Sequence, residues 1–477
     1  MGLDRHRAGV RRVVGSAIVV CAAAVFAAAA SGANPFQSWP MSGQNISNTR
    51  SNAGETQLGP ENVGRLGVKW TFATHGDVSA TPAVVDGAVY FPDWGGYLYK
   101  VDARTGAQIW AHRISEYDGV AGGVSRTGPA VVDGTVYVGV ASLEEALAAF
   151  IPGYVCCSFR GSMLAVDAAS GSVLWKTYMT PPGYSGVAVW ASTPTVDVST
   201  RSLYIGTGNN YSVPQAAKDC ELAGGTPGQC LSPDNHVDAI MSLNMDTGAI
   251  RWATGVQGFD DWNVACIPGV GFPNNCPILP GPDFDFGSGP NLFTIKTGAG
   301  ATMKVVGEGQ KSGQYWALDA ATGRILWSVA PAPGSTLGGI EWGTATDGKR
   351  IYISEANFFG IPYQLPDGST TTSGSLAALD PSTGKILWQI ADPTGNVNLA
   401  PVSAANGVMY ASSMSGHMYA LDANKGTVLW DFAGEGSSNA GPAIANGTVY
   451  WGNGYDHLGI PGFTGSRTFY AFSINGH

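Results

Sequence analysis

The 477-residue sequence predicts an all-β protein that folds as a single β-propeller. Three observations lead to this fold class: the composition, a phrase that repeats along the chain, and a hairpin signal upstream of its copies. The sequence has 67 Gly, and only 13% of its residues are charged. This composition is typical of short strands joined by tight turns, because helices favour Ala, Leu, Glu and Lys. A chain of this length can form a single domain when it is built from structural repeats.

The repeated phrase places Gly four residues, and Trp eight residues, after an Asp or Asn. The Asp or Asn side chain binds backbone amides within a turn, and Gly accepts a positive φ there. The phrase therefore predicts a strand, a tight turn and a second strand whose Trp packs between neighbouring sheets. The six copies run over Asp102–Trp110, Asp167–Trp175, Asn244–Trp252, Asp319–Trp327, Asp380–Trp388 and Asp422–Trp430.

A second hairpin signal lies upstream of the copies. Examples are the turns at Asp86-Gly87, Asp133-Gly134 and Asn446-Gly447, each between apolar, β-branched runs. Asp-Gly and Asn-Gly in this setting are the strongest short-range hairpin signals. Two hairpins make a four-stranded blade, and a ring of such blades makes a propeller. We count seven repeat units, and an eight-bladed ring stays open as the alternative.

The two ends of the repeat region complement each other. The last unit stops at Asn475-Gly476 without its Trp, whereas Trp70 stands in an early strand that has no turn of its own. The first strand is therefore predicted to complete the last blade and close the ring. We interpret the Asp, Gly and Trp of each copy as scaffold, and we expect the chemistry where the repeat is broken.

The N-terminus has the pattern of a signal peptide. Four arginines between Arg5 and Arg12 precede an apolar, Ala-rich stretch over residues 13–30, and small residues suited to cleavage follow. The alternative is a membrane anchor, but the stretch is short and weakly hydrophobic, so its insertion would be marginal, and no later segment could span a bilayer. We therefore predict a signal peptide over residues 1–33, a single mature domain over residues 34–477, and a periplasmic or secreted protein.

The charge pattern argues against nucleic acid as a partner. The formal net charge is -10, and the basic residues beyond the N-terminus are scattered. Binding to a phosphate backbone needs clustered Lys and Arg, so we expect no nucleic-acid partner. An acidic surface suits solubility and a basic redox partner.

Six cysteines lie beyond the predicted signal peptide. They fall as Cys156-Cys157, Cys220 with Cys230, and Cys266 with Cys276. An even number at short spacings in an exported chain predicts disulfides, and the adjacent pair can close a small, stiff ring. No Cys-x-x-Cys occurs in the sequence, so zinc and covalently attached haem c both lack their ligands.

Oxygen-bearing side chains stand in the first two breaks of the repeat. Glu144 and Glu145 precede the adjacent cysteines and Arg160, and Asn209 closes a Gly-Thr-Gly-Asn turn that follows Trp190. Glu, Asn and Asp oxygens are the ligands that Ca²⁺ prefers. The alternative is an ordinary surface charge for the glutamates and an ordinary turn for Asn209.

Carboxylates and a lysine stand in the last two breaks. Asp260 and Asp261 precede the Cys266–Cys276 loop, and Asp283 and Asp285 follow it. A carboxylate beside a metal and a desolvated substrate can serve as a general base, whereas turn capping is the structural alternative. Lys311, in Gly-Gln-Lys-Ser-Gly, is either solvated or faces an anionic or carbonyl-rich ligand.

These four breaks, in this order on this repeat, resemble the PQQ-dependent (quinoprotein) alcohol dehydrogenases over nearly the whole mature chain. The Cys156-Cys157-Ser-Phe-Arg160-Gly161 segment, and the Trp262-Asn263 segment with its cysteine loop, look most like polyvinyl-alcohol dehydrogenases. The resemblance implies PQQ and Ca²⁺ as cofactors and oxidation of a secondary or polymeric alcohol to a ketone or aldehyde. Electrons would leave to a separate cytochrome c or other acceptor, because the chain has no haem motif.

The resemblance also implies a role for each matched position. The calcium ligands would be Glu144 (with Glu145 as the adjacent alternative), Asn209 and Asp283. The PQQ contacts would be Trp190 beneath the quinone, Cys156-Cys157 on its opposite face, Arg160 at a carboxylate and Lys311 at the reactive carbonyl. The catalytic base would be Asp283, with Asp285 as a second ligand or base and Asp260 or Asp261 as alternatives.

Two features depart from the family pattern. The adjacent cysteines follow Glu144 instead of preceding the calcium glutamate, so their disulfide must reach the cofactor from another blade. The usual Trp-Asp of the base segment reads Trp262-Asn263 here. This keeps open a degenerate paralogue without its base, beside a cofactor-free envelope scaffold built on the same repeat. We favour the enzyme, because a scaffold gives no reason to gather such residues in the breaks.

Overall fold

The computed structural model describes Trp39, Met41 and residues 43–45, 47–52, 54–119, 123–297, 300–456, 460 and 462–476. Contacts divide the chain into Met1–Pro35 and Phe36–His477, and all described residues belong to the second unit. The predicted signal peptide over residues 1–33 lies outside the described residues. Within the described part, no helix is both long and apolar enough to cross a membrane.

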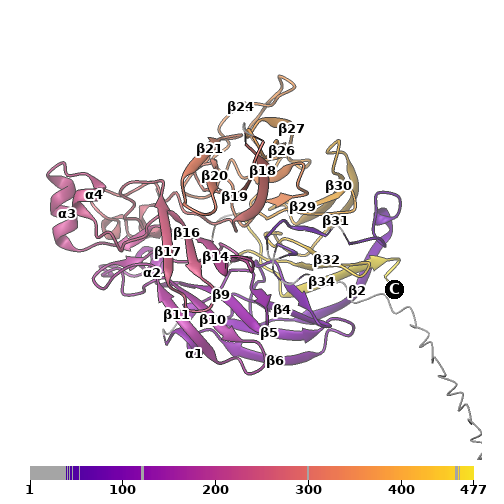
Figure 1. The fold of residues 1–477 in the computed structure, drawn as a ribbon, viewed down its shortest axis with the longest axis horizontal. Helices are drawn as coiled ribbons and strands as arrows, with labels where there is room; N and C mark the ends of the chain where they lie inside the picture. The colour runs from indigo at the N-terminus through magenta and orange to yellow at the C-terminus, as the bar shows by residue number, and fades with distance from the viewer. Residues whose placement is uncertain are drawn as a thin grey trace, which may run out of the picture. The chain divides into compact units, whose positions relative to one another are not determined.

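The described residues form seven four-stranded antiparallel sheets, which are the blades of a propeller (Figure 1). In chain order, the first blade has strands β3 (Ala83–Val85), β4 (Ala88–Pro92), β5 (Tyr97–Asp102) and β6 (Gln108–Arg113), and the second has β8 (Ala130–Val132), β9 (Thr135–Ser142), β10 (Ser162–Asp167) and β11 (Val173–Tyr178). The third blade has β13 (Thr195–Asp197), β14 (Ser202–Gly206), β16 (Ala239–Asn244) and β17 (Ile250–Gly255). The fourth blade has β18 (Asn291–Lys296), β19 (Thr302–Gly309), β20 (Tyr315–Asp319) and β21 (Ile325–Val329). The last three blades are β22 (Ala345–Thr346), β23 (Ile351–Glu355), β26 (Ser375–Leu379) and β27 (Ile386–Ala391); β28 (Ser403–Ala405), β29 (Val408–Ser412), β30 (His417–Asp422) and β31 (Val428–Ala433); and β32 (Ala443–Ala445), β33 (Thr448–Gly452), β34 (Thr468–Ile474) and β2 (Leu66–Ala73).

The last blade is closed by the early strand, as predicted. Strand β2 pairs antiparallel with β34, and Trp70 stands opposite Ala471. The blade number is therefore seven in the described chain, and the eight-bladed alternative is not realised. Short strands extend two blades: β1 (Ser51–Asn52) lies parallel to β28, and β7 (Gly123–Val124) pairs with β9.

The repeated phrase forms the turns that the sequence predicts. Asp102 Oδ1 accepts the backbone N–H groups of Arg104 and Thr105 at 3.0 and 2.8 Å, and Gly106 has φ 75°. The same glycine lets the blades pack: a Cβ on Gly106 would lie 3.0 Å from the Trp70 ring of the preceding blade. The turn glycines Gly248, Gly323, Gly384 and Gly426 meet the Trp of the preceding blade in the same way, whereas Gly171 meets His112.

The core lies between neighbouring blades. Every residue of β14, β23, β29 and β33 is buried, whereas the outermost strands β11 and β17 alternate between exposed and half-buried positions. This is the pattern expected when inner strands are covered by sheets on both faces and outer strands face water. The residues at the inner strand ends are therefore held by rigid, fully packed elements.

Insertions between the blades carry the helices and two small hairpins. They are α1 (Ser115–Asp118), α2 (Glu144–Phe150), α3 (Gln215–Leu222), α4 (Pro227–Cys230), η1 (Val63–Arg65), η2 (Val264–Cys266), η3 (Pro273–Asn275), β12 (Ser185–Gly186) with β15 (Asn210–Ser212), and β24 (Tyr363–Gln364) with β25 (Thr370–Thr371). Helices α3 and α4 project away from the sheets at the left of Figure 1. The side chain of Asn275 joins the Cys266–Cys276 loop to α2 by donating to the carbonyls of Ala148 and Ile151 at 2.7 and 2.8 Å.

The predicted disulfides are present. Cys156 pairs with Cys157, Cys220 with Cys230, and Cys266 with Cys276. The last two each close an insertion that lacks a sheet of its own. Such cross-links stabilise a loop chiefly by restricting its unfolded conformations.

Candidate active site

Residues from most of the blades meet at one cavity of about 100 Å³. They come from segments that connect strands: Arg126 follows β7, Glu145 lies in α2, Trp190 precedes β13, and Lys311 follows β19. The charged and aromatic residues that line the cavity are Arg126, Glu145, Trp190, Trp262, Asp283, Asp285, Lys311, Glu341 and Tyr455. Most of these lie in breaks of the repeat, where the sequence predicts the chemistry.

Trp190 is fixed by two glycines that touch the edges of its ring. A Cβ on Gly208 would lie 3.1 Å from Trp190 Cδ1, and a Cβ on Gly287 would lie 2.8 Å from Cζ2. The Gly-Thr-Gly-Asn turn is therefore needed for close approach to the indole, because any larger residue would push it away. The indole is 5% exposed.

Lys311 stands between two aspartates. Its Nζ lies 2.9 Å from Asp283 Oδ2 and 2.9 Å from Asp285 Oδ2, and 5.1 Å from the centre of the Trp190 ring. Burial alone would lower the pKa of this ammonium, but the two carboxylates outweigh burial and raise the pKa well above its usual value. Lys311 therefore carries a fixed positive charge in the cavity.

Asp283 and Asp285 differ in how their oxygens are used. Both oxygens of Asp285 are engaged, one by Lys311 and the other by the Asn209 backbone N–H at 2.6 Å. Asp283 Oδ2 accepts from Lys311 at 2.9 Å and from the Thr336 hydroxyl at 2.7 Å. Its Oδ1 is buried and has no hydrogen-bond partner among the described residues. Burial, together with Asp285 and Glu145, raises the pKa of Asp283 well above its usual range, although Lys311 opposes the shift.

Asp260 and Asp261, the alternative bases, do not line this cavity. Asp260 holds the turn at Asp283, because its carboxylate accepts the backbone N–H groups of Asp283 and Phe284 at 3.0 and 2.9 Å. Asp283 has φ 58°, a left-handed conformation that a non-glycine residue adopts only when neighbours impose it. Asp261 lines a second cavity.

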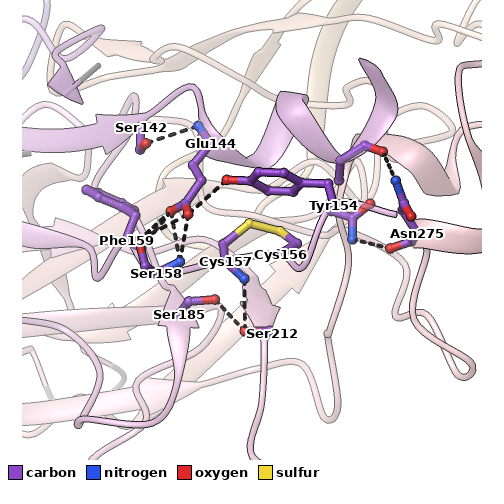
Figure 2. Close-up of a disulfide and its surroundings, with 12 residues drawn as sticks. Ser142, Glu144, Tyr154, Cys156, Cys157, Ser158, Phe159, Ser185, Ser212 and Asn275 are labelled. Atoms are coloured by element: carbon purple, nitrogen blue, oxygen red, sulfur yellow. Dashed lines mark hydrogen bonds between the residues drawn. A yellow bond between two sulfur atoms is a disulfide. The ribbon is translucent and has the colours of Figure 1, made fainter. Parts of the chain in front are cut away.

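The two adjacent glutamates of α2 point to different places. Glu144 accepts the Tyr154 hydroxyl at 3.0 Å and the backbone N–H groups of Ser158 and Phe159 at 2.9 and 2.7 Å (Figure 2). Its carboxylate thus closes the loop that carries the adjacent cysteines. Glu145 lines the cavity instead, where burial raises its pKa to about 7 while Lys311 opposes the shift.

Three residues predicted to contact PQQ, Arg160, Cys156 and Cys157, do not line the cavity. The Arg160 guanidinium donates to the Thr180 carbonyl at 3.0 and 2.6 Å and lies 4.0 Å above the Tyr178 ring. Cys156 lines the second cavity, and neither Cys156 nor Cys157 lines the first. Trp190, Asp283, Asp285 and Lys311 are brought together at the cavity. Asn209 does not line it: its backbone N–H bonds Asp285, and its side-chain amide donates to the carbonyls of Asn210 and Trp262.

Sequence reasoning missed Arg126. Its guanidinium lies 4.6, 4.4 and 5.6 Å from the centres of the Trp94, Trp190 and Trp342 rings, and its Nε has no acceptor among the described residues. The local signal was weak, since a single Arg in Arg126-Thr-Gly-Pro suggests no chemistry. Glu341, whose pKa burial raises to about 7, was not predicted from the sequence either.

The residues present fit a planar, anionic quinone. Trp190 offers a flat aromatic surface, and Arg126 and Lys311 bring two cations to it. Asp283 Oδ1 and Glu145 offer oxygens of the kind that Ca²⁺ binds. No three His, Cys, Asp or Glu side chains in the described part are grouped so as to hold a metal by themselves. Fold and cavity together define a seven-bladed propeller with a charged cavity lined by segments from most of its blades.

Comparison with known proteins agrees with this class. The family model described as outer membrane protein assembly factor BamB matches residues 67–254 and 234–460. A polyvinylalcohol dehydrogenase from a Pseudomonas species is 32% identical, over 77% of this chain and 58% of that protein. A polyvinylalcohol dehydrogenase from Sphingopyxis sp. (strain 113P3) is 33% identical, over 67% of this chain and 48% of that protein.

Solved structures share the fold. The quinohemoprotein alcohol dehydrogenase of Comamonas testosteroni superposes with a TM-score of 0.65 at 19% identity, covering 92% of this chain and 81% of that one. A europium-containing methanol dehydrogenase gives 0.61 at 15% identity, covering 92% and 98%. The chain belongs to the quinoprotein alcohol dehydrogenase family, on the branch of the polyvinyl-alcohol dehydrogenases. It spans about half the length of these two curated relatives.

Proposed function

We propose that this chain oxidises alcohols with PQQ and Ca²⁺, taking secondary alcohols or polyvinyl alcohol to ketones and primary alcohols to aldehydes. One observation carries the proposal: Asp283 presents an unpartnered, buried carboxylate oxygen beside Lys311, which lies over Trp190. This places a base, a cation and a flat aromatic surface around one small cavity.

The residues of the cavity divide between holding the cofactor and moving a proton. Trp190 would support the quinone ring, Arg126 would bind its carboxylates, and Lys311 would face a carbonyl oxygen. Glu145 and Asn209 would supply oxygens to Ca²⁺, with Glu145 in place of Glu144, and Asp283 Oδ1 would stay free for the substrate. PQQ, when bound, supplies the chemistry that takes up two electrons and the hydrogen of the carbinol carbon.

Asp283 is suited to receive the hydroxyl proton of the alcohol at Oδ1. Lys311 and Thr336 both donate to Oδ2 of Asp283, which holds the carboxylate in one orientation and leaves Oδ1 free. The raised pKa of Asp283 makes its ionised form a stronger base than an exposed aspartate. Low dielectric in the buried cavity strengthens the attraction of Lys311 for negative charge that develops there.

The names of the relatives support the substrate and the electron acceptor. The two polyvinylalcohol dehydrogenases point to a polymeric secondary alcohol. A 1-butanol dehydrogenase (cytochrome c) from Thauera butanivorans, 28% identical over 25% of this chain and 16% of that protein, supports a cytochrome c-type acceptor. We further propose export to the periplasm or secretion, on the signal-peptide pattern of residues 1–33 and the disulfides.

The test is reconstitution of the purified chain with PQQ and Ca²⁺. Dye reduction with 2-propanol is expected only when both are present, and Lys311→Met is expected to lower the rate about a hundredfold or more because it removes the cation of the cavity. Lys425→Met, an exposed lysine in a repeat turn, serves as the control. No quinone absorbance on the protein and no dye reduction would favour the cofactor-free scaffold.

A further inference from the structure

A second cavity of about 250 Å³ adjoins the active-site cavity. It is bounded by α3, by the Cys266–Cys276 loop and by Cys156, and all three stand in insertions that the repeat does not require. The proposed chemistry uses none of its side chains. We call it the side cavity.

One stretch of backbone separates the two cavities. Asp261 and Asn263 line the side cavity, whereas Trp262 and Val264, which alternate with them, line the active-site cavity. Adjacent residues lie about 3.8 Å apart at Cα, so the wall is one chain thick. The Cys266–Cys276 loop also lines both cavities, with Ile267 on the active-site cavity and Asn275 on the side cavity.

The side cavity contains a buried acceptor that lacks a donor. Asp261 is 5% exposed, and its Oδ1 has no hydrogen-bond partner among the described residues. Its Oδ2 lies 3.8 Å from Lys218 Nζ, which is too long for a hydrogen bond. A buried carboxylate oxygen left without a donor costs free energy, so a ligand that donates to it would gain affinity.

The other wall of the side cavity is apolar and open to solvent. Ile278 is 86% exposed, Leu222 is 56% exposed and Leu279 is 44% exposed. Exposed aliphatic side chains of this size beside a polar pocket indicate a surface that a hydrocarbon covers. The cavity therefore combines hydrocarbon contact with hydrogen bonding.

The charged side chains of the side cavity offer both donors and acceptors, because Lys218 lines it together with Asp261 and Glu221. An uncharged hydroxyl can donate to Asp261 and accept from Lys218 at once. A hydrocarbon chain that bears hydroxyl groups can therefore contact the apolar wall and form hydrogen bonds with the polar wall.

We propose that the side cavity is a subsite for a polyhydroxylated hydrocarbon chain of the vinyl-alcohol type, and that it holds one segment of the polymer while a nearby carbinol occupies the active-site cavity. This inference rests on the proposed function and names its substrate class. A single small alcohol needs only the active-site cavity, so the subsite distinguishes polymers from monomers.

The test compares a vinyl-alcohol oligomer with 2-propanol on the holoenzyme. Calorimetry without electron acceptor measures oligomer binding, and dye reduction then gives KM and kcat for each alcohol. Asp261→Leu, which is close in size, is expected to weaken oligomer binding about tenfold. Ile278→Ser is expected to weaken it roughly threefold to fivefold. Both variants should raise the KM for the oligomer and leave kcat, and both constants for 2-propanol, unchanged.

Val155→Ser is the matched control, because Val155 is 91% exposed and lines neither cavity. Ile278→Ser keeps the test decisive if Asp261→Leu folds poorly. Unchanged oligomer binding in both variants would overturn the subsite, and so would an equal rise of KM for 2-propanol. If Ca²⁺ displaces the oligomer from the wild type, and Asp261→Leu no longer binds that Ca²⁺, the subsite proposal is overturned and the side cavity is a cation site. If the wild type binds the oligomer but oxidises no alcohol, the proposed function fails and the binding site stands.

Discussion

The carboxylate of Asp260 holds the backbone of Asp283 in place. It accepts the Asp283 N–H at 3.0 Å and the next N–H along the chain at 2.9 Å, where Asp283 has φ 58°. The two residues are separated by the Cys266–Cys276 loop, so this bond closes the insertion on itself. Asp260 is a positioning residue, and Asp283 is the residue that faces the cavity.

Replacing Asp260 should misplace the base without removing it. In Asp260→Asn the amide oxygen can accept only one of the two N–H groups well, and we expect kcat/KM to fall about tenfold to a hundredfold. The loss should appear mainly in kcat, and the acid limb of the pH profile should persist because Asp283 still titrates. An unchanged kcat, or loss of the acid limb, would contradict the positioning role.

Asp283 and Asp285 should be separable by mutation. Asp283→Asn removes the unpartnered oxygen of the proposed base, and kcat should fall by about 10²- to 10⁴-fold with PQQ still bound. Asp285→Asn should cost less, because Asp285 only holds Lys311 and the Asn209 backbone. The rates of single-turnover dye reduction by the two variants, measured at equal PQQ occupancy, show which substitution costs more. A larger loss of kcat in Asp285→Asn than in Asp283→Asn would identify Asp285 as the base.

Glu144 and Glu145 form a matched pair for testing the metal site. Glu145→Gln should weaken Ca²⁺ binding to the PQQ-loaded protein, because it removes a carboxylate from the cavity. Glu144→Gln should leave Ca²⁺ affinity unchanged but lower the thermal midpoint, because it weakens the bonds to Ser158 and Phe159. Calcium titration calorimetry and thermal melts measure the two effects. Equal loss of Ca²⁺ affinity in both variants would contradict the assignment of Glu145 to the metal site and of Glu144 to the loop.

The acids of the cavity should make the apoprotein less stable as pH rises. Burial raises the pKa of both Glu145 and Glu341 to about 7. A carboxyl with a raised folded-state pKa stabilises the fold at pH values below its unfolded pKa, and this contribution is lost as pH rises through the folded pKa. Glu341→Gln should therefore match the wild type near pH 5 and melt at a higher temperature near pH 8. A constant difference across that range would rule out titration of Glu341 as the cause.

The scaffold could be predicted from the sequence because its determinants are local. In the first copy, Asp102 binds the amides two and three residues away, and Gly106 takes a positive φ in the same turn. Closure of the ring could be inferred from Trp70, since a strand without its own turn must pair elsewhere. The blade number was left open because sequence spacing does not fix how many blades close a ring.

The sequence by itself determined a ring of hairpins, three disulfides, and the breaks in which Trp190, Asp283, Asp285 and Lys311 stand. Only the tertiary structure decided which of Glu144 and Glu145 faces the cavity, that Asp260 binds backbone while Asp283 presents an oxygen, and that Arg126 joins Trp190. The repeat is set by bonds within a few residues of the chain. The direction of a side chain in an insertion is set by contacts with other blades, which no local pattern encodes.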